Sequence, residues 1–100
     1  MEIAVVSTKK LSPGKMIGVE KDGQSILIAN IDGAYYAIGN MCTHQGCLLS
    51  DGTLKGGRVE CPCHGSVFDV KTGEVLQGPA DTQEPSFRLR VAGDEILAAT

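Results

Sequence analysis

All the cysteines and histidines of this chain lie in two segments of six residues each. The first reads Cys-Thr-His-Gln-Gly-Cys over residues 42–47, and the second reads Cys-Pro-Cys-His-Gly-Ser over residues 61–66. Each segment offers a cysteine, a histidine two or three positions later, and then a glycine. Thiolate and imidazole groups are the ligands of softer metal ions and of iron–sulfur clusters. This clustering points to metal chemistry, and the kind of centre is the first question.

Four cysteines and two histidines are compatible with several centres. A scaffold of disulfide bonds gives the histidines no role and is rare in chains that are not exported. Zinc accepts two Cys and two His, but common zinc spacings pair Cys with Cys and His with His. A four-cysteine 2Fe–2S cluster would use Cys42-x4-Cys47, as in plant-type ferredoxins, but it lacks their next Cys-x2-Cys step and leaves both histidines unused. The residues alone leave these alternatives open.

A fourth possibility uses both residue types in both segments. Cys42-x-His44 and Cys61-x2-His64, with sixteen residues between them, resemble the motif of the Rieske 2Fe–2S family. In that family two Cys thiolates hold one iron and two His imidazoles hold the other. The resemblance implies that Cys42 and Cys61 hold the inner iron of a Rieske-type 2Fe–2S cluster. It assigns the outer iron to His44 and His64.

The resemblance covers about residues 35–90 and extends beyond the ligands. Further stretches are similar to the Rieske ferredoxins that supply oxygenases, and these are Leu49-Ser50-Asp51-Gly52, residues 64–69, Thr72-Gly73 and Gly78-Pro79-Ala80. By this similarity, Pro79 belongs to a proline loop that covers the cluster from a third side.

Cys47 and Cys63 are a second pair, which oxygenase-type ferredoxins generally lack. They are similar to the extra cysteines of the Rieske subunits of cytochrome bc complexes, which form a disulfide bond between the two ligand loops. The resemblance therefore implies a Cys47–Cys63 disulfide. The alternative is two thiols in a reducing cytoplasm, although a closed-in bridge can resist reduction by cellular thiols.

Two of the residues that follow the second histidine, Ser66 and Phe68, also have expected roles. Ser66 matches the bc-type serine whose hydroxyl bonds a bridging sulfide, so the resemblance places it in contact with the cofactor. Phe68 stands where that group has a tyrosine that bonds a ligand thiolate, and it either tunes the cluster or packs in the core. Leu48 and Leu49 either form a small docking patch or pack under the loop.

The elements that position these residues are expected to be short strands. Thirteen glycines and four prolines interrupt the chain and leave little room for a helix of typical length. Apolar and β-branched runs predict strands at 3–6, 16–20, 25–29, 34–38, 58–60, 67–70, 74–76, 87–91 and 95–99. The Asp-Gly pairs at 22–23 and 32–33 are strong hairpin signals.

This pattern predicts a single all-β domain over residues 1–100 with a Rieske-like fold. The first 38 residues read as an antiparallel meander of three or four strands. An antiparallel base formed by 1–38 and 83–100 is expected to carry a loop-rich, cluster-binding insert at 39–82, with loop character through 39–57.

Composition excludes several classes of function. A net charge of −3 and a pI of about 5.2 argue against a nucleic-acid binder with a basic face, and suit docking to basic patches on proteins. No apolar run approaches the ~20 residues of a membrane helix. The N-terminus lacks the pattern of a signal peptide. We therefore expect a cytoplasmic monomer that contacts neither membrane nor nucleic acid.

The resemblance implies a one-electron carrier, not an enzyme, that passes electrons from a reductase to an oxygenase or another redox partner. Neutral imidazoles in place of two thiolates remove negative charge, so the cluster accepts an electron more readily. A second hypothesis is an accessory subunit of a larger reductase complex, similar to the Rieske-like small subunit of nitrite reductase. Such subunits often lack ligands, whereas this chain has the full set. A zinc-stabilised interaction module is a third, more distant hypothesis.

Overall fold

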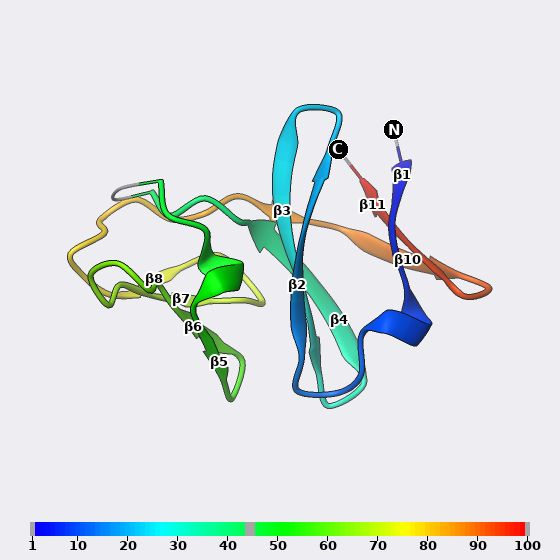
Figure 1. Ribbon diagram of the computed structural model, residues 1–100, viewed down its shortest axis with the longest axis horizontal. Coiled ribbons are helices and arrows are strands. Elements are labelled where there is room, and N and C mark those ends of the chain that lie inside the picture. The colour runs from blue at the N-terminus through cyan, green and yellow to red at the C-terminus, as the bar shows by residue number, and fades with distance from the viewer. Residues whose placement is uncertain (1, 44–45, 100) are drawn as a thin grey trace.

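The computed structural model describes residues 2–43 and 46–99. Within these residues there are eleven strands, two short 3-10 helices and no α-helix. All the strand pairs are antiparallel, and they form three small sheets (Figure 1). The predicted all-β fold is confirmed. Neither of the described helices has the length or apolar character needed to span a bilayer.

The central sheet has the strand order β2-β3-β4-β9. Its strands are β2 (Met16–Lys21), β3 (Gln24–Ile31), β4 (Ala34–Gly39) and β9 (Ser86–Phe87). The Asp-Gly pairs make both of its hairpin turns, as predicted. Asp22 and Asp32 have φ values of 50° and 54°, and the glycines after them also have positive φ, at 78° and 94°. Two consecutive residues at positive φ match the twist of paired strands, which explains the strength of the Asp-Gly signal.

Strand β3 is buried on both faces. Ile26 and Ile28 belong to one hydrophobic cluster, whereas Leu27 and Ala29 belong to the other. Because successive side chains point to opposite faces, a strand between two cores needs an uninterrupted apolar run. The first cluster, which we call the base core, consists of Val5, Leu11, Ile26, Ile28, Ala37, Ile96 and Ala98. The second, the site core, consists of Leu27, Ala29, Ile38, Cys42, Leu49, Val59, Cys61, Phe68, Val70 and Ala80.

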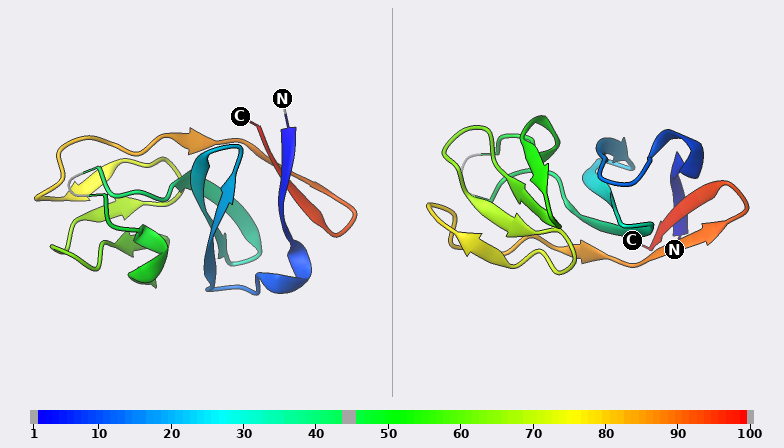
Figure 2. Two further views of the ribbon diagram at one scale, coloured as in Figure 1. Left: turned by 45° about the horizontal axis from the view of Figure 1, so that its top comes forward. Right: turned by 90° about the horizontal axis from the view of Figure 1, so that it is seen from below.

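The second sheet joins the two ends of the chain in the order β1-β11-β10. Its strands are β1 (Glu2–Ser7), β10 (Leu89–Ala92) and β11 (Glu95–Ala99), and the 3-10 helix η1 (Thr8–Lys10) follows β1. Glu2 is aligned with Ala99, so both ends lie side by side in every view (Figures 1 and 2). Since β1 pairs with β11, the predicted meander contains three strands, β2 to β4.

The segment 87–91, predicted as one strand, is divided between two sheets. Phe87 pairs with Ala37 of β4, whereas Leu89 pairs with Ala98 of β11. Both Phe87 and Leu89 pack against the base core, so the alternation that suggested a strand is real. The hydrogen-bonding partner changes at Arg88, because the chain passes from the edge of one sheet to the edge of the next.

The third sheet has the order β5-β6-β7-β8 and lies at the end of the molecule away from the termini (Figure 1). Its strands are β5 (Thr53–Lys55), β6 (Arg58–Glu60), β7 (Val67–Asp69) and β8 (Val75–Gln77). The prediction of loop through 39–57 was wrong in part, since this region contains the 3-10 helix η2 (Leu49–Asp51) as well as β5. Gly56 and Gly57, both at positive φ, form the hairpin turn between β5 and β6.

Asn40 connects the central sheet to the segments around residues 42–50. Its side chain is buried and donates to Ser25 Oγ (3.3 Å) and Ser50 Oγ (3.0 Å), while its Oδ1 accepts from Ser50 N (2.8 Å). Its backbone N–H donates to Ser25 O (3.0 Å), and its backbone carbonyl accepts from Leu49 N (2.7 Å). One buried amide therefore fixes β3 and η2 relative to the chain that leaves β4.

Glu84 is the one charged residue buried among the described residues. Its backbone N–H donates to Gly73 O (2.8 Å), and its Oε2 has no hydrogen-bond partner among the described residues. Burial raises the pKa of Glu84 from 4.5 to about 7, and a hydrogen bond from the Thr43 backbone N–H opposes this rise. A groove of 370 Å³ lies beside it, with Glu20 as the other acidic residue of its lining.

Replacement of Asn40 by Ala is expected to lower the free energy of unfolding by about 2 kcal/mol, because the partly buried Ser50 N–H loses its acceptor. Asn30 is a matched control, since it is also buried and bonds Leu11 O and Gly33 N, away from residues 42–50. Denaturant unfolding measures both losses. Hydrogen exchange of the Ser50 amide should accelerate in N40A and stay unchanged in N30A. Equal exchange in the two variants would contradict the role assigned to Asn40.

The stability difference between Glu84→Gln and the wild type is expected to depend on pH. The pKa of Glu84 is higher in the folded chain than in the unfolded chain, so the unfolded state loses the proton first as the pH rises. The contribution of this carboxyl is therefore fully present below pH 4.5 and is lost as the pH rises to about 7. E84Q should gain stability relative to the wild type between pH 5 and pH 8 in denaturant titrations. E20Q controls for the charge change, and a pH-independent difference for E84Q would contradict the prediction.

Candidate metal centre

The two segments rich in Cys and His have the same backbone hydrogen bonds. In residues 42–47, the first ligand loop, Cys42 N donates to Cys47 O (2.7 Å) and Gly46 N donates to Cys42 O (2.8 Å). In residues 61–66, the second ligand loop, Cys61 N donates to Ser66 O (2.7 Å) and Gly65 N donates to Cys61 O (3.2 Å). Each loop is thus a turn closed between its first and sixth residues.

The glycine at the fifth position of each loop makes this turn possible. Gly46 has a φ of 72° and Gly65 a φ of 80°, which other residues rarely adopt. Because the loops are equivalent, their side chains can be compared position by position. Cys42 corresponds to Cys61 at the first position, and Cys47 corresponds to Ser66 at the sixth. The similarity in sequence is therefore a similarity in backbone structure.

The two cysteines at the first positions are part of the hydrophobic interior. Cys42 and Cys61 are each 3% exposed, and both belong to the site core. His64 of the second ligand loop is exposed. The predicted ligand His44 lies outside the described residues. Three of the four predicted ligands are therefore described, with sulfur on the inner side and imidazole at the surface.

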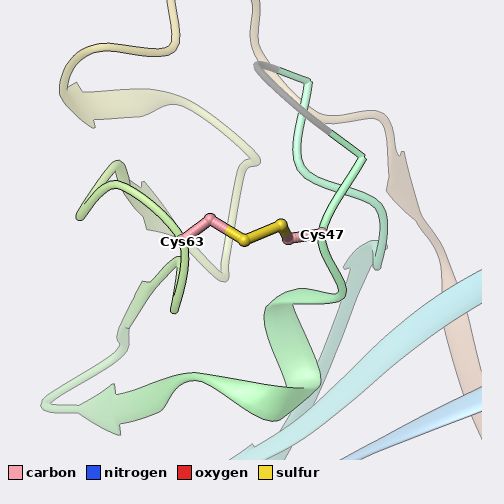
Figure 3. The surroundings of a disulfide bond; sticks show 2 residues. All are labelled: Cys47 and Cys63. Atoms are coloured by element: carbon pink, nitrogen blue, oxygen red, sulfur yellow. A yellow bond between two sulfur atoms is a disulfide. The ribbon is translucent and has the colours of Figure 1, made fainter.

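The other two cysteines form a disulfide bond between the loops (Figure 3). Cys47 and Cys63 have their Cα atoms 6.5 Å apart and are separated by 16 positions in the chain. This is the pairing that the bc-type resemblance implies, and the prediction is confirmed. The sulfur atoms of Cys47, Cys61 and Cys63 lie within 4.8 Å of one another. Since disulfide sulfurs carry no thiolate charge, Cys61 is the thiolate donor of these three.

Residues 77–82, which we call the proline strap, bond both ligand loops. Gln77 Nε2 donates to Gly65 O (3.1 Å), and Ala80 N donates to Ser66 Oγ (3.0 Å). The Thr43 hydroxyl of the first ligand loop donates to Thr82 O (2.5 Å). The strap, which includes Pro79, thus spans both loops, in keeping with its resemblance to a proline loop.

Ser66 offers a hydrogen-bond donor inside the site. It is fully buried, and its Oγ accepts the hydrogen bond from Ala80 N, so its own hydroxyl hydrogen remains to be donated. No acceptor for this hydrogen is found among the described residues. A bridging sulfide would satisfy it. Phe68 is fully buried in the site core and carries no polar group.

Leu49 is fully buried in the site core, so of its two predicted roles packing is correct. Leu48 is half-buried. Sequence reasoning did not single out Met41, which is 52% exposed and directly precedes Cys42. It also did not single out Asn40 or Glu84. In the sequence, Asn40 is a polar amide between the end of a predicted strand and the first ligand loop. Polar residues are common at such turns, so nothing marked it as a buried residue.

The donor set fits a cluster of two metal ions that have different ligands better than it fits a single ion. Two buried thiols stand at equivalent positions of two equivalent loops, a buried hydroxyl lies beside them, and an imidazole is exposed at the surface. Thiolate at one iron and imidazole at the other is the ligation of a Rieske 2Fe–2S cluster.

Comparison with known proteins agrees with this geometry. The model of the Rieske [2Fe-2S] domain family matches residues 1–90. The ferredoxin component of the naphthalene 1,2-dioxygenase system of Pseudomonas aeruginosa is 32% identical over 95 residues, covering 95% of this chain and 91% of that protein. The ferredoxin of carbazole 1,9a-dioxygenase from Nocardioides aromaticivorans IC177 superposes with a TM-score of 0.93 at 30% identity, covering 99% of this chain and 97% of that chain.

A second solved structure contains a ferredoxin bound to another protein. It is described as the complex of reduced oxygenase and oxidized ferredoxin in carbazole 1,9a-dioxygenase. The matching chain has a TM-score of 0.92 at 30% identity, covering 98% of this chain and 92% of its own length. With a family model that spans nine tenths of the sequence and relatives that match it end to end, this chain belongs to the Rieske [2Fe-2S] domain family, and its cofactor is a Rieske-type 2Fe–2S cluster.

Proposed function

We propose that this chain is a one-electron carrier that passes electrons from a reductase to an oxygenase or to another redox partner. The observation that carries this proposal is the asymmetry of the site, in which both thiols are buried and His64 is exposed. Electron transfer between proteins needs a redox group near the surface, and the imidazole side of the site provides that approach. The relatives described above are named as ferredoxin components of dioxygenase systems, which supports the same role.

The proposal assigns each ligand. Cys42 and Cys61 hold the inner iron, and His44 and His64 hold the outer iron. The insert 39–82 supplies all four ligands, and the base formed by 1–38 and 83–100 carries it. We propose that the chain acts as a carrier in the cytoplasm and has no catalytic activity of its own.

The chain's own residues determine how the site would work. When bound, the cluster supplies one-electron redox chemistry. Burial of Cys42 and Cys61 keeps water from the thiolates, while the Ser66 hydroxyl offers a hydrogen bond that stabilises added negative charge at sulfur. His64, exposed on the imidazole side of the site, offers a path to a partner. Met41, exposed directly before the first ligand loop, adds an apolar side chain that a docking partner can contact.

The ligand assignment predicts that substitution of the two cysteine pairs has different effects on the iron content of the protein. C42S, C61S and H64A should each purify with at least tenfold less iron than the wild type, because each removes a direct ligand. The double variant C47S/C63S is the matched control, since it removes two cysteines that the disulfide excludes as ligands. Iron and zinc analysis, with EPR of the reduced protein, checks both results. Iron loss in C47S/C63S together with full iron in C61S would overturn the assignment.

Hydrogen bonding to the cluster sulfur predicts opposite effects at Ser66 and Phe68. Ser66→Ala should lower the midpoint reduction potential, because it removes a donor that stabilises the reduced state. Phe68→Tyr should raise it, because a hydroxyl is added beside the buried cysteines. Ser86→Ala, on the exposed strand β9, is the control. Redox titration followed by absorbance measures the shifts, and unchanged potentials in both variants would refute this account of tuning.

A further inference from the structure

We infer that Glu84 is a positioning residue for the cluster, because its buried carboxyl holds Thr43 and thereby fixes the first ligand loop. This inference rests on the proposed ligand set, in which Thr43 stands between Cys42 and His44. Glu84 lies outside both ligand loops, and the ligand motif does not include it.

Thr43 is attached twice to the segment 82–84. Its hydroxyl donates to Thr82 O (2.5 Å), and its backbone N–H donates to the Glu84 carboxyl group. The Thr43 side chain is exposed, so the protein packs little against it. These two hydrogen bonds therefore tie the residue between the two proposed ligands to the segment 82–84. A change at either bond can move Cys42 relative to Cys61.

Glu84 is itself tightly confined. Its backbone N–H bonds Gly73 O (2.8 Å), and the next residue, Pro85, accepts from Gly39 N (2.9 Å). A Cβ atom on Gly73 would collide with the backbone carbonyl of Glu84, and a Cβ atom on Gly39 would collide with its Oε1. Gly39 thus leaves space for the carboxyl group, and Gly73 leaves space for the backbone of Glu84. Glu84 is therefore confined between β4 and the turn after β7.

The carboxyl is costly for the fold, which distinguishes it from ordinary packing. Its Oε2 is buried without a partner among the described residues, and the carboxyl group as a whole accepts from the Thr43 backbone N–H. An unpaired buried polar atom destabilises a protein, so an apolar side chain of similar volume would be more stable here. A polar group that is present although it destabilises the fold is typical of a position with a role in the functional site.

Two conservative variants separate position from charge. Glu84→Asp keeps the carboxylate but withdraws it by one methylene, so it no longer reaches Thr43. Glu84→Gln removes the charge but keeps an oxygen at the same reach. Glu20→Asp, on the exposed rim of the same groove, is the matched control. The measurements on the holoprotein are the EPR spectrum of the reduced cluster, its midpoint potential and the rate of iron release to a chelator.

If Glu84 positions the loop, E84D should release iron about tenfold faster than the wild type and show a changed EPR spectrum and midpoint potential. E84Q and E20D should resemble the wild type. An E84D variant that matches the wild type in all three measurements overturns the inference, and so does an altered E84Q beside an unaltered E84D. A wild-type protein that holds no iron overturns the proposed function and this inference together, whereas a normal cluster insensitive to E84D overturns this inference alone.

Discussion

Cys42 and Cys61 are members of the same hydrophobic cluster as Leu27 of the central strand and Phe68 of the third sheet. These two proposed ligands are therefore not attached to a finished core but form part of it. Removing water from this cluster and bringing the two thiols together are one event in folding. A chain that packs the site core correctly has at the same time placed the inner donors, which explains how irregular loops can define a site.

A disulfide bond and the hydrogen bonds of the proline strap hold the ligand loops against each other. The Cys47–Cys63 disulfide closes a segment of 16 positions, for which restriction of the unfolded chain contributes about 3 kcal/mol. The proline strap bonds Gly65 and Ser66 on one side and Thr43 on the other. Asn40 in addition connects η2, which follows the first ligand loop, to the central sheet. Rigidity of this kind limits the rearrangement that must accompany a change of charge at the site.

Local signals in the sequence predicted local structure well. Asp22-Gly23 and Asp32-Gly33 define hairpins because the turn needs positive φ, and the run 26–29 marks a strand buried on both faces. The disulfide pairing came from resemblance to a family, not from spacing. The positions of His44 and of its neighbour Gln45 lie outside the described residues, so the structure leaves that ligand as a prediction.

Features that depend on distant partners could not be predicted. The pairing of β1 with β11 and the change of partner at Arg88 are set by which sheet edge is available, which no window of sequence contains. The same holds for Asn40 and Glu84, since a polar residue gives no sign that it will be buried until its partners are assembled.

Strands β1 and β11 bring the two ends of the chain together, far along the 39 Å length of the molecule from the ligand loops (Figure 1). A protein domain fused at either end would lie at the end of the molecule opposite the ligand loops and would leave these loops uncovered. A short linker between residues 2 and 99 would likewise allow new ends to be opened at an exposed turn such as 22–23, since circular permutation is tolerated where ends lie close together. With its ends placed in this way, the same domain can carry electrons either as a separate protein or as part of a fusion, with no change in its metal site.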